Sequence, residues 1–300
     1  MTKILLGLNC NTLVNRYTEP LEWPRIVGEE LSLRFVQFST DLLDPYLPFA
    51  IQRRIIKETL EYCKRCDVTI KSSFGGHFSH QHYLGHPDKE VRREAERWYA
   101  RAIWQAASLG AEGFGVCFAI MTVRDNADPR RRREILEDAI ASYHRLALEA
   151  KKEGLKYLAF EAMSVERESV ATIKEAQRLL DACSDMAVPM KICLDVGHRN
   201  PASGNPKDAD PCAWIRALGR HAPVIHIQQT DETGSLHGPF TREANRSGII
   251  RPGEIIRAIN EYGADEVLLA FEITTKAFHP HEDRHLEYWK ESVRYWRRFL

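Results

Sequence analysis

Four short runs of strand-forming residues in the second half of the chain each end in a side chain that binds metal ions well. The runs occupy residues 158–161, 192–195, 224–226 and 269–272, and they end in Glu161, Asp195, His226 and Glu272. Successive members of this set are 34, 31 and 46 positions apart, about one strand plus one helix each time. If successive strands are parallel neighbours, the four side chains converge at one end of a barrel. We interpret them as one catalytic centre.

Apolar segments of strand length alternate with longer helical patterns along the chain. Most of the strand segments are continuous apolar runs, as expected for strands covered on both faces. The strands are predicted at 4–8, 35–39, 68–72, 113–118, 155–161, 190–195, 224–228 and 266–272, and the helices at 21–33, 48–66, 88–109, 131–153, 165–183, 211–220, 252–262 and 285–300. Eight strand–helix pairs predict an α/β fold, a (β/α)8 TIM barrel, with residues 1–300 as a single domain.

The chemistry of the four strand-end residues favours a divalent cation. Taken singly, each has an ordinary structural alternative: a strand-ending Glu often forms a salt bridge, Asp195 can cap a turn, and His226 can be a hydrogen-bonded core histidine. Burying three carboxylates together is costly without a cation, and one or more would become protonated. Three carboxylates and an imidazole suit Mn²⁺, Mg²⁺ or Co²⁺. We therefore predict one such ion held by Glu161, Asp195, His226 and Glu272.

Other polar residues are expected at the same end of the barrel. Gln228 lies two positions beyond His226 and shares its inward direction, and His198 follows Asp195 by three positions and is placed to contact a substrate. Long loops at the carboxyl ends of barrel strands build substrate pockets. Loop 74–87 carries His77, His80, His82 and His86, which either bind substrate or lie in solvent, and loop 230–251 carries His237, Arg242, Asn245 and Arg246.

Composition limits the other partners of the chain. Lys plus Arg and Asp plus Glu both number 42, so there is no general attraction to nucleic acid or to an anionic membrane. No apolar run has transmembrane length, and seven scattered cysteines favour reduced thiols in the cytoplasm. Cys63 and Cys66 form a C-x-x-C at the end of a predicted helix, whereas a redox motif lies at a helix start, so we interpret them as ordinary thiols.

At these residues the chain resembles the xylose-isomerase-like barrel superfamily, in particular its sugar and sugar-phosphate isomerases and epimerases, which include tagatose 3-epimerase. The Glu–Asp–His–Glu metal set of those enzymes matches the four strand-end residues in chain order, and their substrate-contacting histidine matches His198. Residues 160–164, 192–198 and 237–241, with the downstream Asn245, are similar to the erythrulose-phosphate 3-epimerase branch. The resemblance spans the whole chain and implies a tetrulose phosphate as substrate.

Two positions in the substrate loop depart from these families. Glu232 stands where tagatose-3-epimerase-like enzymes have an arginine, six residues after the strand-seven histidine. Gly238 stands where the erythrulose-phosphate branch has an aromatic residue. Both departures lie outside the metal set, so the reaction type transfers better than the identity of the sugar.

The ligand set and the resemblance together predict a divalent-metal-dependent epimerase. It would invert the carbon next to the carbonyl of a ketose or ketose phosphate through a cis-enediolate. One of Glu161 and Glu272 would remove the proton and the other would return it to the opposite face. Substrate would be held by His198, Gln228, His237 and Asn245, and Lys71, Arg242 and Arg246 are available as donors for a phosphate.

Three alternatives stay open at this point. The same enediolate gives an aldose–ketose isomerase if the proton returns to the neighbouring carbon. A remote alternative is the apurinic endonuclease of the same superfamily, which needs Asp-x-His after strand seven, where this chain has Asp231-Glu232-Thr233. A barrel that binds sugar without catalysis is the third. The aromatic-rich last helix packs either on the barrel or on a partner subunit of a homo-oligomer.

Overall fold

Eight parallel strands form a closed barrel in the order β1-β10-β7-β6-β5-β4-β3-β2. The computed structural model describes residues 1–76, 83–274 and 284–300. The barrel strands are β1 (Lys3–Asn9), β2 (Phe35–Ser39), β3 (Thr69–Phe74), β4 (Gly113–Cys117), β5 (Tyr157–Glu161), β6 (Met190–Asp195), β7 (Val224–Ile227) and β10 (Glu266–Phe271). The predicted barrel is confirmed, and each predicted strand is within two residues of the observed one at either end.

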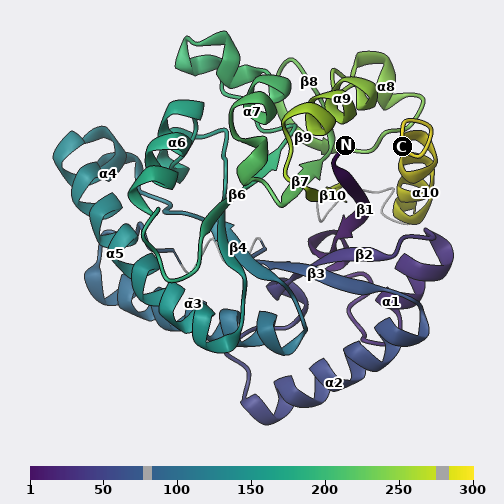
Figure 1. The fold of residues 1–300 in the computed structure, drawn as a ribbon, viewed down its shortest axis with the longest axis horizontal. Coiled ribbons are helices and arrows are strands. Elements are labelled where there is room, and N and C mark those ends of the chain that lie inside the picture. Colours follow the sequence, from purple (N-terminus) through teal and green to yellow (C-terminus); the bar gives the residue numbers. More distant parts are fainter. Residues whose placement is uncertain (77–82, 275–283) are drawn as a thin grey trace.

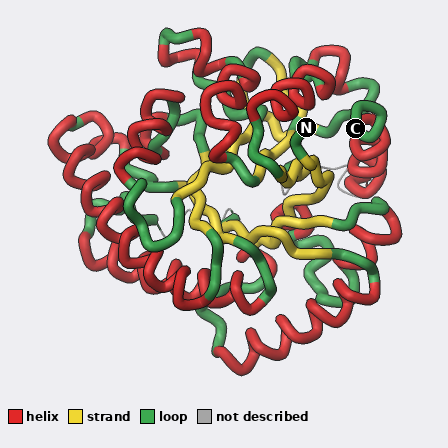
Figure 2. The backbone as a smooth tube through the Cα atoms, in the orientation of Figure 1, coloured by secondary structure: helices red, strands yellow, loops and turns green. Residues whose placement is uncertain are grey.

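Helices surround the barrel on all sides in the view along its axis (Figures 1 and 2). They are α1 (Trp23–Arg25), α2 (Phe49–Arg65), α3 (Lys89–Ser108), α4 (Val123–Ala127), α5 (Pro129–Glu153), α6 (Ile173–Ala182), α7 (Pro211–Leu218), α8 (Ala244–Ser247), α9 (Pro252–Tyr262) and α10 (His285–Trp296). Helix α5 shows how the sequence determines where a helix begins and ends. At its start the Asp128 side chain accepts hydrogen bonds from two backbone N–H groups. At its end Gly154 adopts a left-handed φ of 86°.

Apolar side chains pack in two separate clusters. The larger cluster lies between strands and helices and includes Trp289 and Trp296 of α10, so the last helix packs on the barrel. The smaller cluster fills the interior of the barrel and consists of Leu5, Phe74, Cys193, Val224, Leu268 and Ala270. These inner residues form a floor beneath the carboxyl ends of the strands. The barrel is therefore filled below that end, and only its rim is free to carry polar groups.

The helix expected at 165–183 begins later than predicted. Ser169 and Val170 adopt positive φ angles of 63° and 59°, which no helix accommodates. Thr172 then accepts a hydrogen bond from the backbone N–H of Glu175 and caps α6, which starts at Ile173. The residues before it form an irregular segment after β5, at the rim that carries Glu161.

An antiparallel hairpin interrupts the loop that follows β7. Strand β8 (Gln229–Asp231) pairs with β9 (Gly234–Gly238), whereas the sequence predicts a loop over 230–251. Helix α8 follows the hairpin, so the 230–251 segment has its own secondary structure. The hairpin starts at the residue after Gln228 and brings His237 back toward the barrel.

Lys71 lies at the amino-terminal end of the barrel, opposite the rim where a donor to a substrate phosphate was expected. Its ammonium group pairs with Glu266, the first residue of β10, at 2.7 Å, and with Glu112, directly before β4. Strand β3 extends to Phe74 rather than ending at Ser72, which moves Lys71 away from the rim. Burial opposes the charge on Lys71, but the hydrogen bonds that its ammonium group donates to the two carboxylates outweigh burial and raise its pKa. This ion cluster closes the lower end of the barrel.

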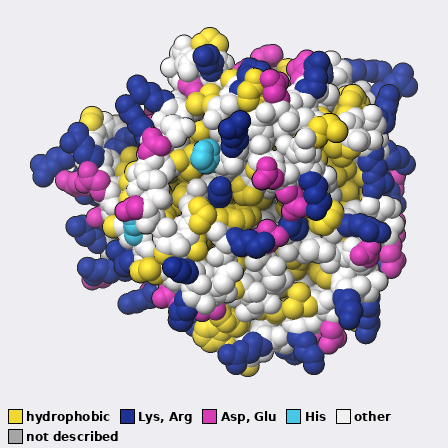
Figure 3. All heavy atoms as spheres, in the orientation of Figure 1, with side chains coloured by type: hydrophobic (Ala, Val, Ile, Leu, Met, Phe, Trp, Pro, Cys, Tyr) yellow, Lys and Arg dark blue, Asp and Glu magenta, His cyan; other side chains and the backbone are white. Residues whose placement is uncertain are grey.

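The surface mixes both signs of charge, as the zero net charge requires. Figure 3 shows Lys and Arg side chains interspersed with Asp and Glu over one face of the molecule. Within the described residues, none of the helices is long and apolar enough to cross a lipid bilayer. All seven cysteines are free thiols, and burial raises the pKa of Cys63 to about 12, which agrees with an ordinary buried thiol.

Replacing Lys71 by Met should destabilise the fold without changing substrate affinity. The change leaves Glu112 and Glu266 without their shared partner, and we expect a loss of about 1–2 kcal/mol in the free energy of unfolding. The matched control is Lys156→Met, because Lys156 contacts the same Glu112 at 3.3 Å from a side chain that is 70% exposed. Urea titrations measure both variants, and a raised KM with unchanged stability in Lys71→Met would contradict the assignment.

The effect of Lys71→Met should also depend on pH. Burial would raise the pKa of Glu112, but hydrogen bonding to Lys71 outweighs it and lowers that pKa. A lowered folded-state pKa gives stability that is present above the unfolded value near 4.3 and is lost as pH falls through the folded value. The stability difference between wild type and variant should therefore shrink below about pH 4.

Candidate metal centre and active site

Four adjacent strands bring the four predicted ligands together. Glu161 ends β5, Asp195 ends β6, His226 lies in β7, and Glu272 directly follows β10. In the sheet register, Asp195 is paired with His226, and His226 is paired with Ala270, two residues before Glu272. One ligand atom from each of the four side chains lies within 4.8 Å of the others, and all four residues are buried. The expected convergence at the barrel rim is thus observed.

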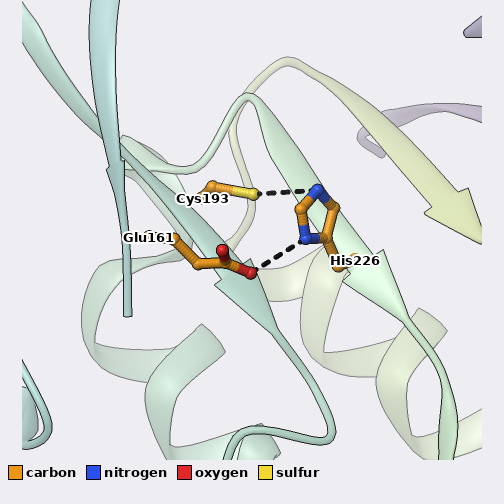
Figure 4. A group of neighbouring side chains, drawn as sticks. All are labelled: Glu161, Cys193 and His226. Atoms are coloured by element: carbon orange, nitrogen blue, oxygen red, sulfur yellow. Dashed lines mark hydrogen bonds and ion pairs between the residues drawn. The ribbon is translucent and has the colours of Figure 1, made fainter. Parts of the chain in front are cut away.

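His226 occupies the middle of this group. Its Nδ1 lies 3.0 Å from Glu161 Oε1 and 3.1 Å from Glu272 Oε2. On the other side of the ring, Nε2–H donates to Gln37 Oε1 at 2.6 Å. Figure 4 shows the ring between Glu161 and Cys193, with one nitrogen directed at each. Since two carboxylate oxygens face Nδ1, that position needs either a proton or a cation.

Glu272 is held from one side only. Its Oε1 accepts hydrogen bonds from the amides of Asn9 at 3.1 Å and Asn11 at 2.6 Å. Its Oε2 is buried and accepts no hydrogen bond from the described residues, although it faces His226. A buried carboxylate oxygen without a donor is costly, and a cation in the centre of the group removes that cost.

Asp195 is fixed by its neighbours in the chain and by the next strand. Its Oδ1 accepts from the backbone N–H of Gly197 at 2.6 Å. The Gln228 side-chain amide donates to both carboxylate oxygens, at 3.1 and 2.9 Å. A side chain on Gly197 would collide with Gln228, since an added Cβ would lie 2.3 Å from its amide carbon. Gln228 is fully buried, so it supports Asp195 rather than facing open space.

His198 and His237 complete the rim. The His198 Nδ1–H donates to the Ala162 carbonyl at 2.9 Å, and its Nε2 lies 3.7 Å from Asp195 Oδ2. The His237 Nδ1–H donates to the Glu272 carbonyl at 3.2 Å, and the two imidazoles meet edge to face with centroids 5.6 Å apart. His237 adopts a φ of 49°, and Gln228 accepts its backbone N–H. Both predicted histidines therefore lie beside the metal-type cluster.

Burial and neighbouring charges act in opposite directions on the pKa values of this cluster. Burial raises the pKa of Asp195. Burial alone would lower the pKa of His198, but Asp195 and Glu161 outweigh it and raise that pKa to about 9. The pKa of Glu272 would be raised by burial, but the charge of His226 holds it well below its usual value. The carboxylates thus favour positive charge on the neighbouring imidazole of His198, and a divalent cation among them would supply such charge directly.

The donor set fits a hard or borderline divalent ion. It offers three carboxylates and one imidazole, and the other nitrogen of that imidazole is already committed to Gln37. A metal-binding histidine typically donates its second N–H to an oxygen in this way. Glu161, Asp195, His226 and Glu272 are the residues that would hold the ion.

Sequence reasoning missed three residues that support the cluster: Asn9, Asn11 and Gln37. Gln37 interrupts the apolar run of β2, and Asn9 ends β1 directly after its apolar run, so each carried a weak signal. Both residues are fully buried, with exposed fractions of 1% or less. Their role became visible only once barrel closure placed β1 and β2 beside β10 and β7.

Several candidates lie elsewhere. Asn245 accepts from Gln229 at 2.8 Å and donates to the Phe240 carbonyl, so it supports the hairpin instead of facing the metal cluster. With Arg242 and Arg246 it lines a separate hollow of about 440 Å³ against α10. These three residues therefore lie apart from the metal-type cluster, and a contact between any of them and substrate stays a prediction.

The remaining loop predictions have different outcomes. His86 Nδ1 accepts from the backbone N–H of Asp88 at the start of α3, a structural role. His77, His80 and His82 lie outside the described residues. Glu232, the departure from the family pattern, pairs with Arg199 at 3.1 Å and joins the hairpin to the loop after β6.

The chain belongs to the family described as xylose isomerase-like TIM barrel, whose model matches residues 29–299. It is 34% identical over 295 residues to the D-erythrulose 1-phosphate 3-epimerase of Brucella abortus (strain 2308), covering 98% of this chain and 95% of that protein. The expected superfamily is thereby confirmed, and so is the expectation that the chain is an enzyme.

Two solved structures illustrate the fold similarity. A protein from Rhodospirillum rubrum, provisionally named a xylose isomerase, has a TM-score of 0.89 and 26% identity over 98% of this chain and 99% of that one. The D-psicose 3-epimerase of Clostridium cellulolyticum H10, solved with D-tagatose, has a TM-score of 0.69 and 17% identity over 99% of both chains. At that identity the second similarity shows the barrel fold alone.

Replacing Gln37 by Leu should weaken metal binding. The change removes the acceptor for His226 Nε2–H, and loss of such a partner typically costs 10–100-fold in metal affinity. Gln37→Glu keeps an acceptor and should retain tight binding. Isothermal titration calorimetry of metal-free protein with Mn²⁺ measures the affinity of both variants. The control is Gln177→Leu, because Gln177 is an exposed residue of α6. Equal affinity in wild type and Gln37→Leu would contradict the role assigned to Gln37.

Proposed function

We propose that the chain is a divalent-metal-dependent epimerase that inverts the carbon next to the carbonyl of a ketose or ketose phosphate, with a tetrulose phosphate favoured. The observation that carries the proposal is the pair of buried carboxylates, Glu161 and Glu272, on either side of one metal-type centre. The relative that is 34% identical along nearly the whole chain bears the name of such an epimerase. A cytoplasmic location is part of the proposal, in keeping with seven free thiols.

Glu161 and Glu272 are suited to move the proton. Inversion needs one group that removes a proton and a second that returns one to the opposite face. The two carboxylates come from strands separated in the ring by β6 and β7, so a carbon held over His226 lies between them. Asn9 and Asn11 fix one oxygen of Glu272, which leaves Oε2 directed at the centre. Which glutamate acts as the base would depend on the direction of reaction.

The histidines would orient the substrate, and the cation would stabilise negative charge on it. The hydrogen bond from Nδ1–H to the Ala162 carbonyl fixes the His198 ring, and Nε2, 3.7 Å from Asp195 Oδ2, is the atom that would contact a substrate oxygen. His237 borders the same space from the hairpin, and buried Gln228 holds both the His237 backbone and Asp195 in place. A bound Mn²⁺, Mg²⁺ or Co²⁺ supplies positive charge for the substrate oxygens as the cis-enediolate forms.

The size and charge of the substrate are inferred from the relative. D-Erythrulose 1-phosphate is the sugar in the name of the Brucella protein, so a phosphorylated tetrulose is the first substrate to test. Arg242 and Arg246 lie at a separate hollow and Lys71 at the opposite end of the barrel, so none of the three is proposed to hold the phosphate.

Aldose–ketose isomerisation is the second candidate, since the Rhodospirillum protein with the same fold has an isomerase name. The two reactions differ in where the proton returns. Proton NMR of the products formed in D₂O separates them: an epimerase gives a ketose with one deuterium at the inverted carbon, and an isomerase gives an aldose. An aldose as the main product would overturn the proposal of an epimerase.

Removal of the metal should abolish turnover reversibly. Protein treated with EDTA and dialysed should lose activity on tetrulose phosphates and regain it with Mn²⁺, Mg²⁺ or Co²⁺. A coupled assay or NMR measures the rates, and protein carried through the same dialysis without EDTA is the control. Full activity after complete metal removal, verified by atomic emission, would exclude the metal-dependent mechanism.

Glu161→Gln should lower kcat by about 10²–10⁴-fold, because the amide cannot accept the substrate proton. The same substitution at Glu149, which is exposed on α5, should leave kcat unchanged. Exchange of the substrate proton with D₂O, followed by NMR, tests the assignment directly. A Glu161→Gln variant that still exchanges that proton at the wild-type rate would rule out Glu161 as a proton-transfer group.

A further inference from the structure

A hollow rich in arginine lies between α10 and the segment that contains α8 (Figure 1). Its volume is about 440 Å³, and no residue of the metal-type cluster lines it. Two exposed arginines come from each of the two segments, namely Arg242, Arg246, Arg294 and Arg298. The proposed epimerase reaction does not use this hollow, so the gathering of arginines needs another explanation.

The positive charge of the hollow is not compensated by neighbouring side chains. None of the four arginines forms an ion pair with another residue in the described part of the chain. The lining contains one carboxylate, Glu291, and its Oε1 accepts the backbone N–H of Arg242 at 2.7 Å. The chain as a whole has zero formal charge, so this hollow is a local excess of positive charge.

The dipole of α10 explains only two of the four arginines. Arg294 lies in the last turn of α10 and Arg298 just beyond it, where cations are stabilised by the negative end of the helix. Arg242 and Arg246 come from a different segment. Like charges brought together repel each other, so placing these two against the arginines of α10 costs free energy unless an anion lies between them.

Buried contacts hold the two sides of the hollow in place. The fully buried ring of Phe240 stacks on Tyr295 of α10, with ring centroids 6.2 Å apart. The backbone N–H of Phe240 donates to Ser292 Oγ at 2.8 Å, and the side-chain amide of Asn245 donates to the Phe240 carbonyl at 3.1 Å. The backbone that carries the arginines is therefore preorganised, which lowers the entropy cost of binding a ligand.

We propose that this hollow is a binding site for a small anion that carries at least two phosphate groups. Arginine binds phosphate with two parallel N–H groups, and each such fork engages two oxygens. A terminal phosphate group has only three free oxygens, so four guanidinium groups exceed what one group can engage in this way. The hollow would take such an anion independently of the metal-type cluster and of the sugar.

Isothermal titration calorimetry with inorganic pyrophosphate tests the proposal. The full chain is titrated in EDTA, which keeps pyrophosphate from chelating a metal at the cluster. We expect wild type to bind one pyrophosphate, at least about tenfold more tightly than inorganic phosphate. Arg294→Gln with Arg298→Gln should weaken binding about a hundredfold, and Arg246→Gln, on the opposite side, about tenfold.

The matched control removes two exposed arginines elsewhere. Arg53→Gln with Arg257→Gln, on α2 and α9, makes the same change in net charge away from the hollow and should bind pyrophosphate as wild type does. Circular dichroism checks the fold of each variant. If the double glutamine variant of α10 unfolds, Arg294→Lys with Arg298→Lys replaces it. That variant keeps the charge but loses the forks, and should still bind pyrophosphate more weakly than wild type.

Several results would overturn the anion site. They are no binding of pyrophosphate by wild type, equal affinity for phosphate and pyrophosphate, or equal affinity in the α10 variant and the control. A wild-type dimer that dissociates in the α10 variant, seen by sedimentation velocity, would also overturn it, because the arginines would then contact a second copy of the chain.

Turnover of tetrulose phosphates separates this site from the proposed function. The α10 variant should lose pyrophosphate binding and keep the KM of wild type. A KM raised in that variant alone would assign the arginines to the substrate phosphate and overturn a separate site. Pyrophosphate binding at the hollow of a protein without turnover would support the anion site and count against the epimerase proposal.

Discussion

Repulsion among three buried carboxylates is the constraint on which the upper half of this barrel depends. Glu161, Asp195 and Glu272 approach one another to within 4.8 Å in a region with almost no access to water. Only positive charge in their midst makes that arrangement favourable, whether from imidazolium groups or from a cation. The neutral amides of Asn9, Asn11, Gln37 and Gln228 orient these groups without changing the charge. The site is therefore preorganised for a cation.

The two ends of the barrel differ in how their buried charges are compensated. At the lower end, Lys71 pairs with both Glu112 and Glu266, and Lys156 and Lys3 each pair with one of these carboxylates, so the charges are compensated within the protein. At the upper end, excess negative charge is left for a ligand to neutralise. An apolar floor that includes Phe74 and Leu268 separates the two ends. Stability and chemistry are thus assigned to different ends of the same strands, as in other barrels of this kind.

The barrel and the cluster of Glu161, Asp195, His226 and Glu272 were predictable because the signal for each is local in the sequence. Each of the four residues ends an apolar run, and the spacing of the runs implies parallel neighbours. Asn9 and Gln37 were missed because their function arises from contacts between strands over 180 residues apart, which barrel closure alone creates. Lys71 was misassigned because β3 extends two residues further than its apolar pattern suggests. The hairpin was missed because β8 and β9 are short and lack a clear alternation of apolar residues.

The hairpin of β8 and β9 has a consequence for how such an enzyme can change. It is a two-stranded antiparallel ribbon between β7 and α8. It contacts the site through His237, whose backbone N–H donates to the Gln228 side chain. The ring beside it needs none of the hairpin's backbone hydrogen bonds to stay closed. A hairpin of this kind can be replaced by one of different length or sequence while the barrel strands stay the same. Evolution or protein engineering could change the preferred sugar in this way.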